Sequence, residues 1–164
     1  MYYIFLDIDG VLNTENDWKR PFSLNKKCID NFLAYIRKLR DKNNKEELRV
    51  ILTSSWKTGF NKNGSHAPHI EELTRNFLKD QLFITDKTTD LGDDRGKSVE
   101  AYIKQYGIPA NKYIVFDDDK ALFPSSPTLN VYYTNSKTGF TEQDIKKAVP
   151  GEKRAWYDIF KIAR

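Results

Sequence analysis

The stretch FLDIDGVLN, residues 5–13, decides how the rest of the chain is interpreted. It follows an apolar Tyr-Tyr-Ile segment and places two carboxylates, Asp7 and Asp9, one residue apart before a glycine. In a strand, side chains alternate with a period of two, so both carboxylates would point to the same side. Two like charges so close raise the pKa of one carboxyl group unless a cation lies between them. The motif therefore predicts either a turn that ends a strand or a site that binds a cation.

The composition is that of an ordinary globular chain. With 164 residues, of which 39% are hydrophobic and 30% charged, the sequence predicts a single domain over residues 1–164 with a hydrophobic core. It contains no run of about 18 apolar residues, so no membrane span is expected. The first residues lack the pattern of a secretory signal, and the single cysteine, Cys28, lies among apolar residues; both features indicate a reducing, cytoplasmic setting. The net charge of +4 is compatible with an anionic substrate, including nucleic acid.

Hydrophobic periodicity predicts strands that alternate with helices. Short apolar runs predict buried strands, and apolar residues spaced three or four apart predict amphipathic helices after capping residues such as Ser23 or Asn25. This alternation is typical of an α/β fold with one doubly wound, mostly parallel, Rossmann-like sheet. The predicted strands are residues 2–6, 48–52, 82–85, 112–119 and 129–134, and the predicted helices are residues 25–39, 69–78, 97–106, a helix after Thr141 with Asp144 in its cap, and an apolar segment at Trp156, Ile159, Phe160 and Ile162.

Polar side chains gather where three of the predicted strands end. In an open α/β sheet, sites form outside the carboxyl ends of the strands, so neighbouring strands would bring these groups into one crevice. Each group alone is explained by a turn, a solvated loop or a surface lysine. Together they favour a site for Mg²⁺ and phosphate, because Mg²⁺ prefers oxygen ligands. The groups are Asp7 and Asp9 after the first strand, Thr53, Ser54 and Ser55 after the second, Arg95 and Lys97 before the fourth, and Asp117, Asp118 and Asp119 at its end.

This ordered set resembles the haloacid dehalogenase (HAD) superfamily of phosphohydrolases. More narrowly, the segments ILTSSW, RGKSVEAYI and YIVFDDD are similar to small HAD domains associated with RNA-repair proteins. The resemblance covers about residues 1–134 and implies a HAD-like fold with a minimal cap or none. The first motif is matched by DIDGV at residues 7–11, the second by Ser54 or Thr53 after RVIL, the third by Lys97 or Arg95, and the fourth by DDD at residues 117–119.

The resemblance implies a magnesium-dependent phosphatase that works through an aspartyl-phosphate intermediate. Asp7 would attack phosphorus, while Asp9 would protonate the leaving oxygen and then take a proton from water. The carboxylate of Asp7, the backbone carbonyl of Asp9 and the carboxylate of Asp118 would hold the metal. Asp117 would be a further ligand or an orienting group, and Ser54 would hydrogen-bond a phosphoryl oxygen.

The third motif offers two basic residues, and the sequence favours Lys97 as the catalytic one. Because Lys97 opens a predicted helix, we expect its ammonium group to reach the strand ends and to offset charge on the phosphoryl group. Arg95 is then expected to contact the substrate, together with Thr53 and Trp56. Two positions depart from the common pattern, since Val11 replaces a threonine and Trp56 stands where many relatives have a small residue or an arginine.

No large cap domain fits into the sequence. Residues 13–47 hold mostly one predicted helix, and residues 57–96 hold elements that the core itself needs. An open site suits a phosphate at the end of a nucleic acid. Trp18 or Trp56 could stack on a base there, although such tryptophans are more often packed.

Three alternatives stay open. A receiver-like signalling domain is also a doubly wound sheet with acids and a lysine, but Asp9 argues against it because a second carboxylate supplies an acid and base for turnover. The intact acidic motifs disfavour an inactive HAD-type interaction module. A phosphatase of small metabolites or nucleotides remains, and the sequence assigns neither the substrate nor the oligomeric state.

Overall fold

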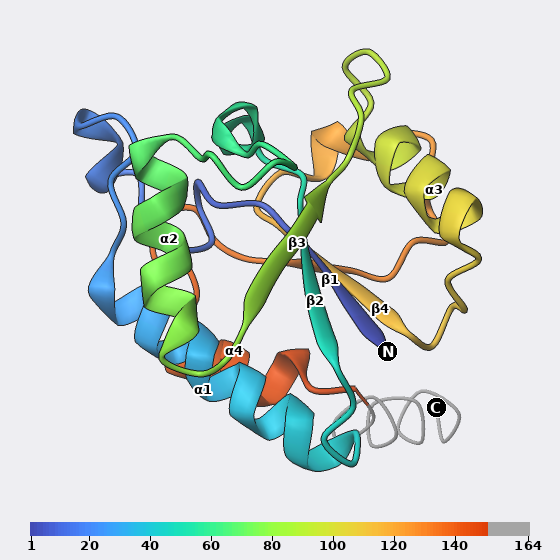
Figure 1. Ribbon diagram of the computed structural model, residues 1–164, viewed down its shortest axis with the longest axis horizontal. Helices are drawn as coiled ribbons and strands as arrows, with labels where there is room; N and C mark the ends of the chain where they lie inside the picture. Colours follow the sequence, from blue (N-terminus) through green and yellow to red (C-terminus); the bar gives the residue numbers. More distant parts are fainter. Residues whose placement is uncertain (151–164) are drawn as a thin grey trace, which may run out of the picture.

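The computed structural model describes residues 1–150 and shows a five-stranded sheet with helices on both faces (Figure 1). The strand order is β3-β2-β1-β4-β5, and every pairing is parallel. The predicted α/β class with a doubly wound parallel sheet is confirmed. The strands are β1 (Tyr2–Leu6), β2 (Leu48–Leu52), β3 (Phe83–Lys87), β4 (Tyr113–Asp117) and β5 (Val131–Tyr133), and the helices are α1 (Lys26–Lys42), α2 (Pro68–Leu78), α3 (Arg95–Tyr106) and α4 (Glu142–Ala148).

The central strand β1 is buried on both faces. Ile4 and Leu6 pack into the larger core, whereas Phe5 packs into a second core on the opposite face of the sheet. A strand covered on both sides has no polar face, which explains why β1 is a continuous apolar run in the sequence. The first polar side chains after it, beginning with Asp7, therefore lie at the carboxyl edge of the sheet.

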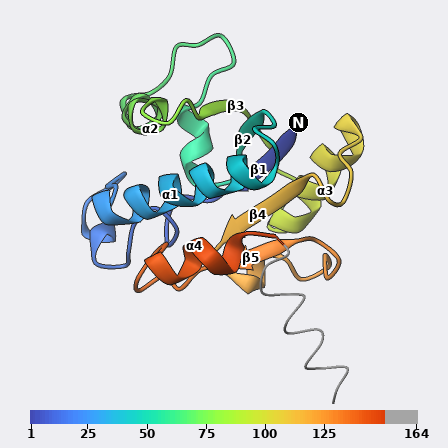
Figure 2. The same ribbon diagram turned by 90° about the horizontal axis from the view of Figure 1, so that it is seen from below.

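The helices divide unequally between the two faces of the sheet (Figure 2). Side chains of α1, α2 and α4 contribute to the larger core, while α3 supplies Val99 to the smaller one. Of the two predicted caps for α1, Asn25 is the one used, since its side chain accepts from the backbone N–H of Cys28. The predicted cap of α4 is confirmed, because Thr141 and Asp144 form a reciprocal capping box.

Two predicted boundaries differ from the structure in ways that affect the site. The edge strand β3 runs to Lys87 rather than ending at Thr85, because an edge strand tolerates polar residues. Helix α3 begins at Arg95 rather than Lys97, because the side chain of Asp94 caps it by accepting from the backbone N–H of Lys97 at 3.1 Å. The predicted apolar segment at residues 156–162 lies outside the described residues, and the single domain over residues 1–164 stays a prediction.

The carboxyl edge of the sheet is not covered by an inserted domain within residues 1–150. The segment between β1 and α1 contains a short 3-10 helix, η1 (Asp17–Lys19), and the segment between β2 and β3 contains a second one, η2 (Ser55–Gly59), followed by α2. No helix in this part of the chain is long and apolar enough to cross a membrane. The absence of a large cap, predicted from the sequence, is confirmed for the described residues.

Candidate active site

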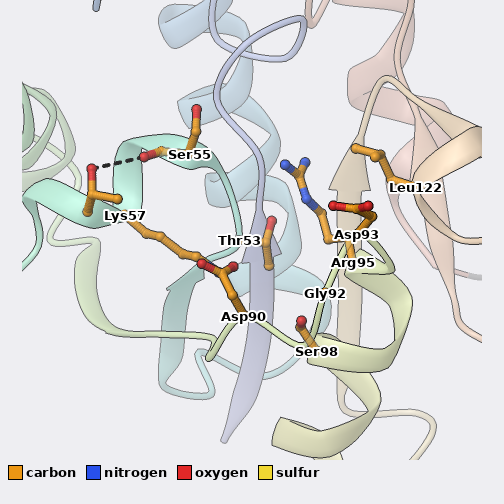
Figure 3. A pocket seen from close by; sticks show the side chains of 10 residues that line it. Thr53, Ser55, Lys57, Asp90, Gly92, Asp93, Arg95, Ser98 and Leu122 are labelled. Carbon is orange, nitrogen blue, oxygen red and sulfur yellow. Dashed lines mark hydrogen bonds and ion pairs between the residues drawn. The ribbon is translucent and has the colours of Figure 1, made fainter.

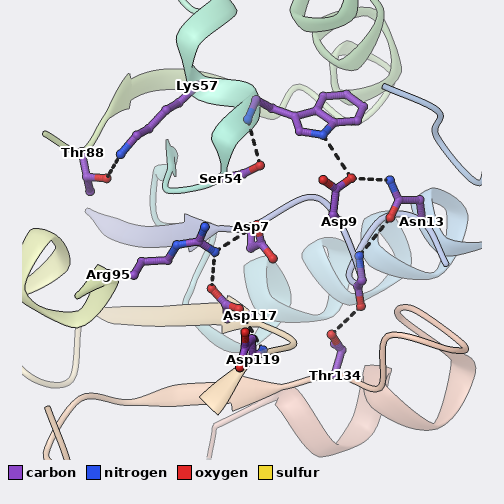
Figure 4. A network of polar contacts seen from close by, with 12 residues as sticks. Asp7, Asp9, Asn13, Ser54, Lys57, Thr88, Arg95, Asp117, Asp119 and Thr134 are labelled. Carbon is purple, nitrogen blue, oxygen red and sulfur yellow. Dashed lines mark hydrogen bonds and ion pairs between the residues drawn. The ribbon is translucent and has the colours of Figure 1, made fainter. Parts of the chain in front are cut away.

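Asp7 lies at the end of β1 beside the end of β4. Its backbone N–H donates to the carbonyl oxygen of Phe116 at 3.0 Å, which fixes the chain against β4. Its side chain is 7% exposed, and Oδ1 lies 3.2 Å from Nη1 of Arg95. The same Arg95 nitrogen lies 2.7 Å from Oδ2 of Asp117, which is fully buried (Figure 4). One guanidinium group thus joins the ends of two neighbouring strands.

Three carboxylates meet at this point with one cation beside them. Oxygen atoms of Asp7, Asp117 and Asp118 lie within 4.8 Å of one another. Burial raises the pKa of Asp7 well above its usual value, and the charges of Asp117 and Asp118 raise it further, against the opposing effect of Arg95. Burial also raises the pKa of Asp118. Arg95 alone therefore does not balance the three carboxylates, and their oxygen donors fit a divalent cation such as Mg²⁺.

The two adjacent aspartates of the fourth motif have different contacts. Both oxygens of Asp117 are engaged, since Oδ2 accepts from Arg95 and Oδ1 accepts from the backbone N–H of Asp119 at 3.0 Å. Asp118 instead approaches Gly10, whose φ of +82° is a conformation that L side chains rarely adopt. A Cβ atom at residue 10 would lie 2.3 Å from Oδ2 of Asp118. Glycine at this position therefore makes room for the carboxylate of Asp118.

Asp9 is held by a separate network of neutral donors. Its Oδ1 accepts from Nδ2 of Asn13 at 2.9 Å and from Nε1 of Trp56 at 3.1 Å (Figure 4). Asn13 is itself buried, and its Oδ1 accepts from the backbone of Gly10 and from Nε1 of Trp18, each at 2.9 Å. Trp56 is 1% exposed, so it is packed and not available to stack on a base. Sequence reasoning missed Asn13, although it directly follows the first motif.

The two hydroxyl residues after β2 differ in their partners. The hydroxyl of Thr53 is buried and has no hydrogen-bond partner among the residues that the structure describes. The backbone N–H of Thr53 donates to the carbonyl oxygen of Leu6 at 3.1 Å, so Thr53 continues the pairing of β2 with β1. The hydroxyl oxygen of Ser54 accepts from the backbone N–H of Trp56 at 3.1 Å and thereby caps η2. Thr53 therefore presents the freer hydroxyl group.

Lys97 does not join the acidic cluster. Its side chain is exposed, and within residues 1–150 it makes no ion pair with a carboxylate. The expectation that its ammonium group reaches the strand ends is not met, because α3 begins two residues earlier and presents Arg95 instead. The signal that identifies Arg95 is Asp94, a good capping residue that places Arg95 in the first turn.

A cavity of about 480 Å³ adjoins the cluster (Figure 3). It is lined by Thr53 and Arg95, which also belong to the surroundings of Asp7, and on another side by Lys57 and Asp90. Lys57 is buried, which is uncommon for a lysine. The cavity thus extends the site away from the acidic cluster toward β3.

A parallel α/β sheet with paired aspartates after its first strand, hydroxyls after its second and acids at the end of its fourth defines a phosphohydrolase of the HAD superfamily. The family model described as the HAD domain in Swiss Army Knife RNA repair proteins matches residues 3–145, so the chain belongs to this family. It is accordingly a phosphomonoester hydrolase of the HAD type.

Among solved structures, the chain is similar to the cobalt-bound form of the deoxy-D-mannose-octulosonate 8-phosphate phosphatase from Haemophilus influenzae. The two chains are 15% identical, with a TM-score of 0.43 over 90% of this chain and 88% of that chain. No curated protein sequence matches the chain.

Proposed function

We propose that this chain is a Mg²⁺-dependent phosphatase that forms an aspartyl-phosphate on Asp7 and acts on the terminal phosphate of a nucleic acid. The observation that carries the reaction is the pairing of two unlike aspartates. Asp7 is buried beside Arg95 and two further carboxylates, whereas Asp9 is held apart by neutral N–H donors. Such a division suits a nucleophile and a separate acid and base.

In the first step, a carboxylate oxygen of Asp7 attacks phosphorus while the bond from phosphorus to the leaving oxygen breaks. Asp9 gives its proton to that oxygen, so the leaving group departs as a neutral alcohol. In the second step, Asp9 takes a proton from water, and the water oxygen attacks the phosphorus of the aspartyl-phosphate. The bond between phosphorus and Asp7 breaks, which releases inorganic phosphate and restores the carboxylate.

The contacts of Asp9 support its role as the proton carrier. Both Asn13 and Trp56 donate to the same oxygen, Oδ1, which leaves Oδ2 for exchange of a proton with the leaving group or with water. These two donors also fix the plane of the carboxyl group, because they come from different segments of the chain. A fixed acid reduces the reorganisation needed in the transition state.

Asp118 is the better candidate for direct metal ligation among the two fourth-motif aspartates. Asp117 already binds Arg95 and the backbone of Asp119, so it positions the arginine. The metal would be held by the carboxylates of Asp7 and Asp118 and by the backbone carbonyl of Asp9. When bound, a divalent cation supplies the positive charge that lowers repulsion between the phosphate and these carboxylates.

Three side chains are placed to bind the oxygens of the phosphoryl group. Arg95 lies beside Asp7 and retains a positive charge at every relevant pH. The buried hydroxyl of Thr53 has no partner in the described residues and lines the same cavity as Arg95. Ser54 uses its oxygen as an acceptor in capping η2, so its hydroxyl hydrogen remains available to donate. These donors would stabilise charge that develops in the transition state.

Three observations support a nucleic-acid end as the substrate. The carboxyl edge of the sheet carries no cap within residues 1–150, the chain has a net charge of +4, and the family is described by its occurrence in RNA repair proteins. A small metabolite gains little from an open site, whereas a longer backbone offers additional phosphate contacts.

The cytoplasmic setting stays a prediction from the single cysteine and the first residues of the sequence.

The reaction is tested with an aryl phosphate such as p-nitrophenyl phosphate, which needs no specific substrate contacts. We expect hydrolysis with Mg²⁺, loss of hydrolysis in excess chelator, and recovery when Mg²⁺ is restored. Full activity in chelator would contradict the metal assignment. No hydrolysis under any of these conditions would contradict the proposed reaction.

The substrate is tested by comparing a phosphorylated oligonucleotide with the corresponding mononucleotide at low and moderate salt. We expect the oligonucleotide to have the higher kcat/KM and the steeper decline with salt, because lysine–phosphate contacts release counterions. Equal kcat/KM values and equal salt dependence would instead favour a small-molecule phosphatase.

A further inference from the structure

The cavity beside the acidic cluster contains a buried cation that the proposed reaction does not use. Lys57 is 7% exposed, and its Nζ lies 3.1 Å from Oγ1 of Thr88 and 2.6 Å from Oδ1 of Asp90. Burial of a lysine is uncommon because its charge loses the solvation of water. A buried ammonium group at the wall of an active-site cavity therefore requires an explanation.

The segment that carries Lys57 is fixed to the edge strand of the sheet. Nζ of Lys87, the last residue of β3, donates to the carbonyl oxygen of Lys57 at 3.1 Å and to that of Phe60 at 2.7 Å. The side chain of Lys57 is fixed separately by Thr88, which is buried. A cation held in this way loses little conformational freedom when it binds an anion.

The acid that neutralises Lys57 is poorly held. The side chain of Asp90 is 78% exposed, and Asp90 lies in the loop between β3 and α3. An exposed carboxylate contributes little to an ion pair and returns to water at low cost. An ammonium group has three N–H donors, and the third has no acceptor among residues 1–150. An incoming anion can therefore take the place of Asp90 while Thr88 keeps the ammonium group in position.

The cavity places this cation alongside the reaction centre. Thr53 and Arg95 line the same cavity as Lys57, so a phosphoryl group at Arg95 and an anion at Lys57 would share one continuous space (Figure 3). Asp93 also lines the cavity, but it is exposed, so solvent screens its charge. The two cations of the cavity are thus arranged for a ligand with two negative groups.

We propose that Lys57 forms a second anion subsite, which binds the phosphodiester next to the terminal phosphate that is hydrolysed. This inference rests on the proposed function and specifies how the site would distinguish a nucleic-acid end from a simple phosphomonoester. A lysine acts as a point charge without the planar geometry of arginine, so it recognises a phosphate without reading the base. The subsite therefore selects for a neighbouring phosphate and not for sequence.

The test compares Lys57→Met with Lys104→Met, a matched loss of charge at an exposed position on α3. The substrates are p-nitrophenyl phosphate, a mononucleotide, and a dinucleotide that carries the same terminal phosphate plus one phosphodiester. For the dinucleotide, Lys57→Met is expected to lower kcat/KM by roughly tenfold to a hundredfold, as for loss of a charged hydrogen bond. For p-nitrophenyl phosphate the change is expected to stay within about twofold, and Lys104→Met is expected to change neither value.

A second variant tests the role of Asp90 as the displaced group. Asp90→Asn keeps the loop and removes the competing charge, so we expect KM for the dinucleotide to fall while KM for p-nitrophenyl phosphate stays the same.

A nucleoside 3′,5′-bisphosphate serves as a further substrate that shows whether the second phosphate must belong to a strand. If Lys57→Met affects it as strongly as the dinucleotide, the subsite binds a second phosphate from either source; if it affects the dinucleotide alone, the subsite requires the phosphodiester of a strand.

Binding provides a measurement that does not depend on turnover. In the Asp7→Asn background, affinity for the phosphorylated dinucleotide is expected to fall when Lys57→Met is added. Equal losses on all substrates, or no loss on the dinucleotide in either assay, would overturn the subsite. Failure of the wild-type protein to hydrolyse p-nitrophenyl phosphate would instead overturn the proposed reaction, while the binding measurement would still decide whether Lys57 holds a phosphate.

Discussion

Asp7 and Asp9 are separated by one residue, yet their surroundings have little in common. Asp7 is buried among charged groups, with Arg95 on one side and the fourth-motif carboxylates on the other. Asp9 is partly exposed and accepts two hydrogen bonds from the neutral side chains of Asn13 and Trp56. The neighbours of Asp7 act on it mainly through their charges, whereas the neighbours of Asp9 orient it through hydrogen bonds.

The difference arises because β1 ends before the motif does. The strand ends at Leu6, and the chain then turns, with the carbonyl oxygen of Ile8 accepting from the backbone N–H groups of Val11 and Leu12. The period-two alternation of a strand therefore no longer decides where the second carboxylate points. Two identical side chains acquire different surroundings because one adjoins β4 and the other adjoins η2.

The largest expected effect comes from substitution of Asp7, the aspartate with charged neighbours. Asp7→Asn removes the oxygen that we propose as the nucleophile, so we expect kcat for p-nitrophenyl phosphate to fall by roughly ten-thousandfold or more and no phosphoenzyme to form. Acid quench after reaction with a radiolabelled phosphomonoester measures the phosphoenzyme. Appreciable turnover by this variant, with a labelled protein, would place the nucleophile elsewhere.

Asp9→Asn is expected to cost less, because the nucleophile remains. Loss of the acid and base should lower kcat by roughly a hundredfold to ten-thousandfold. The loss should be greater for an alkyl phosphate than for p-nitrophenyl phosphate, since the alkyl leaving group depends more on a proton. If the loss is equal for both, Asp9 has a role other than proton transfer. A wild-type protein that holds its phosphoryl group for minutes without turnover would support the receiver-like alternative.

The two basic residues of the third motif give the next comparison. Arg95→Gln should lower kcat by roughly a hundredfold to a thousandfold, because the guanidinium group beside Asp7 is lost. Lys97→Gln, at an exposed position of the same helix, should change kcat by no more than about twofold. Near-ultraviolet circular dichroism checks that Arg95→Gln still folds, since the substitution removes the cation beside the buried Asp117. The reverse order of effects would restore Lys97 as the third-motif residue.

A smaller effect is expected on the side of Asp9. Trp56→Phe keeps most of the buried ring but removes the N–H that donates to Oδ1, so we expect kcat for an alkyl phosphate to fall by about tenfold. The loss should be smaller for p-nitrophenyl phosphate, because its leaving group depends less on a proton. Trp18→Phe, which removes a donor to Asn13 instead, is the matched control. An equal loss on both substrates together with a lowered melting temperature would mean that Trp56 only packs.

The smallest expected effect is on stability, and here the substitution of Asp7 is expected to be a gain where the earlier substitutions are expected to be losses of activity. The pKa of Asp7 is raised in the folded protein, mainly by burial, so the folded state holds this proton more tightly than the unfolded state. Stability due to Asp7 is therefore present below its ordinary value of 3.8 and is lost as the pH rises through the raised value. In chelator at pH 7, Asp7→Asn should raise Tm by on the order of 5 °C, with no gain near pH 3. A lower Tm at pH 7 would contradict the charge account.

The fold was largely predictable, because it depends on local patterns. The buried run of β1 and the three-to-four spacing of Ile29, Phe32 and Ile36 in α1 each report burial directly. The start of α3 was predicted two residues too late, because the apolar pattern of this helix begins after its first turn and Asp94 was not considered as a cap. The hydrogen bond from the backbone N–H of Lys97 to Asp94 defines the first turn of the helix.

The site was predictable only in part, because several of its contacts join distant segments. The acids and hydroxyls could be placed at strand ends, since a parallel sheet aligns those ends. Trp56 and Asp9, by contrast, are 47 residues apart, and Lys57 and Thr88 are 31 residues apart. No periodicity connects such pairs, so their hydrogen bonds follow from the three-dimensional arrangement of η2 beside β1 and β3.

The conformation of residue 10 also has a stereochemical consequence. Its positive φ is the mirror image of the ordinary region, so a D-amino acid adopts it readily, and a D-alanine methyl replaces the hydrogen opposite the crowded L position. Because Cys28 is the single cysteine, the bond before it is a natural junction for ligating a synthetic peptide of residues 1–27 to the remaining chain. L-alanine at this position meets the carboxylate of Asp118, and we expect D-alanine, whose methyl group points the other way, to be tolerated better. The handedness of one carbon atom at residue 10 thus decides whether a side chain there meets the carboxylate of Asp118.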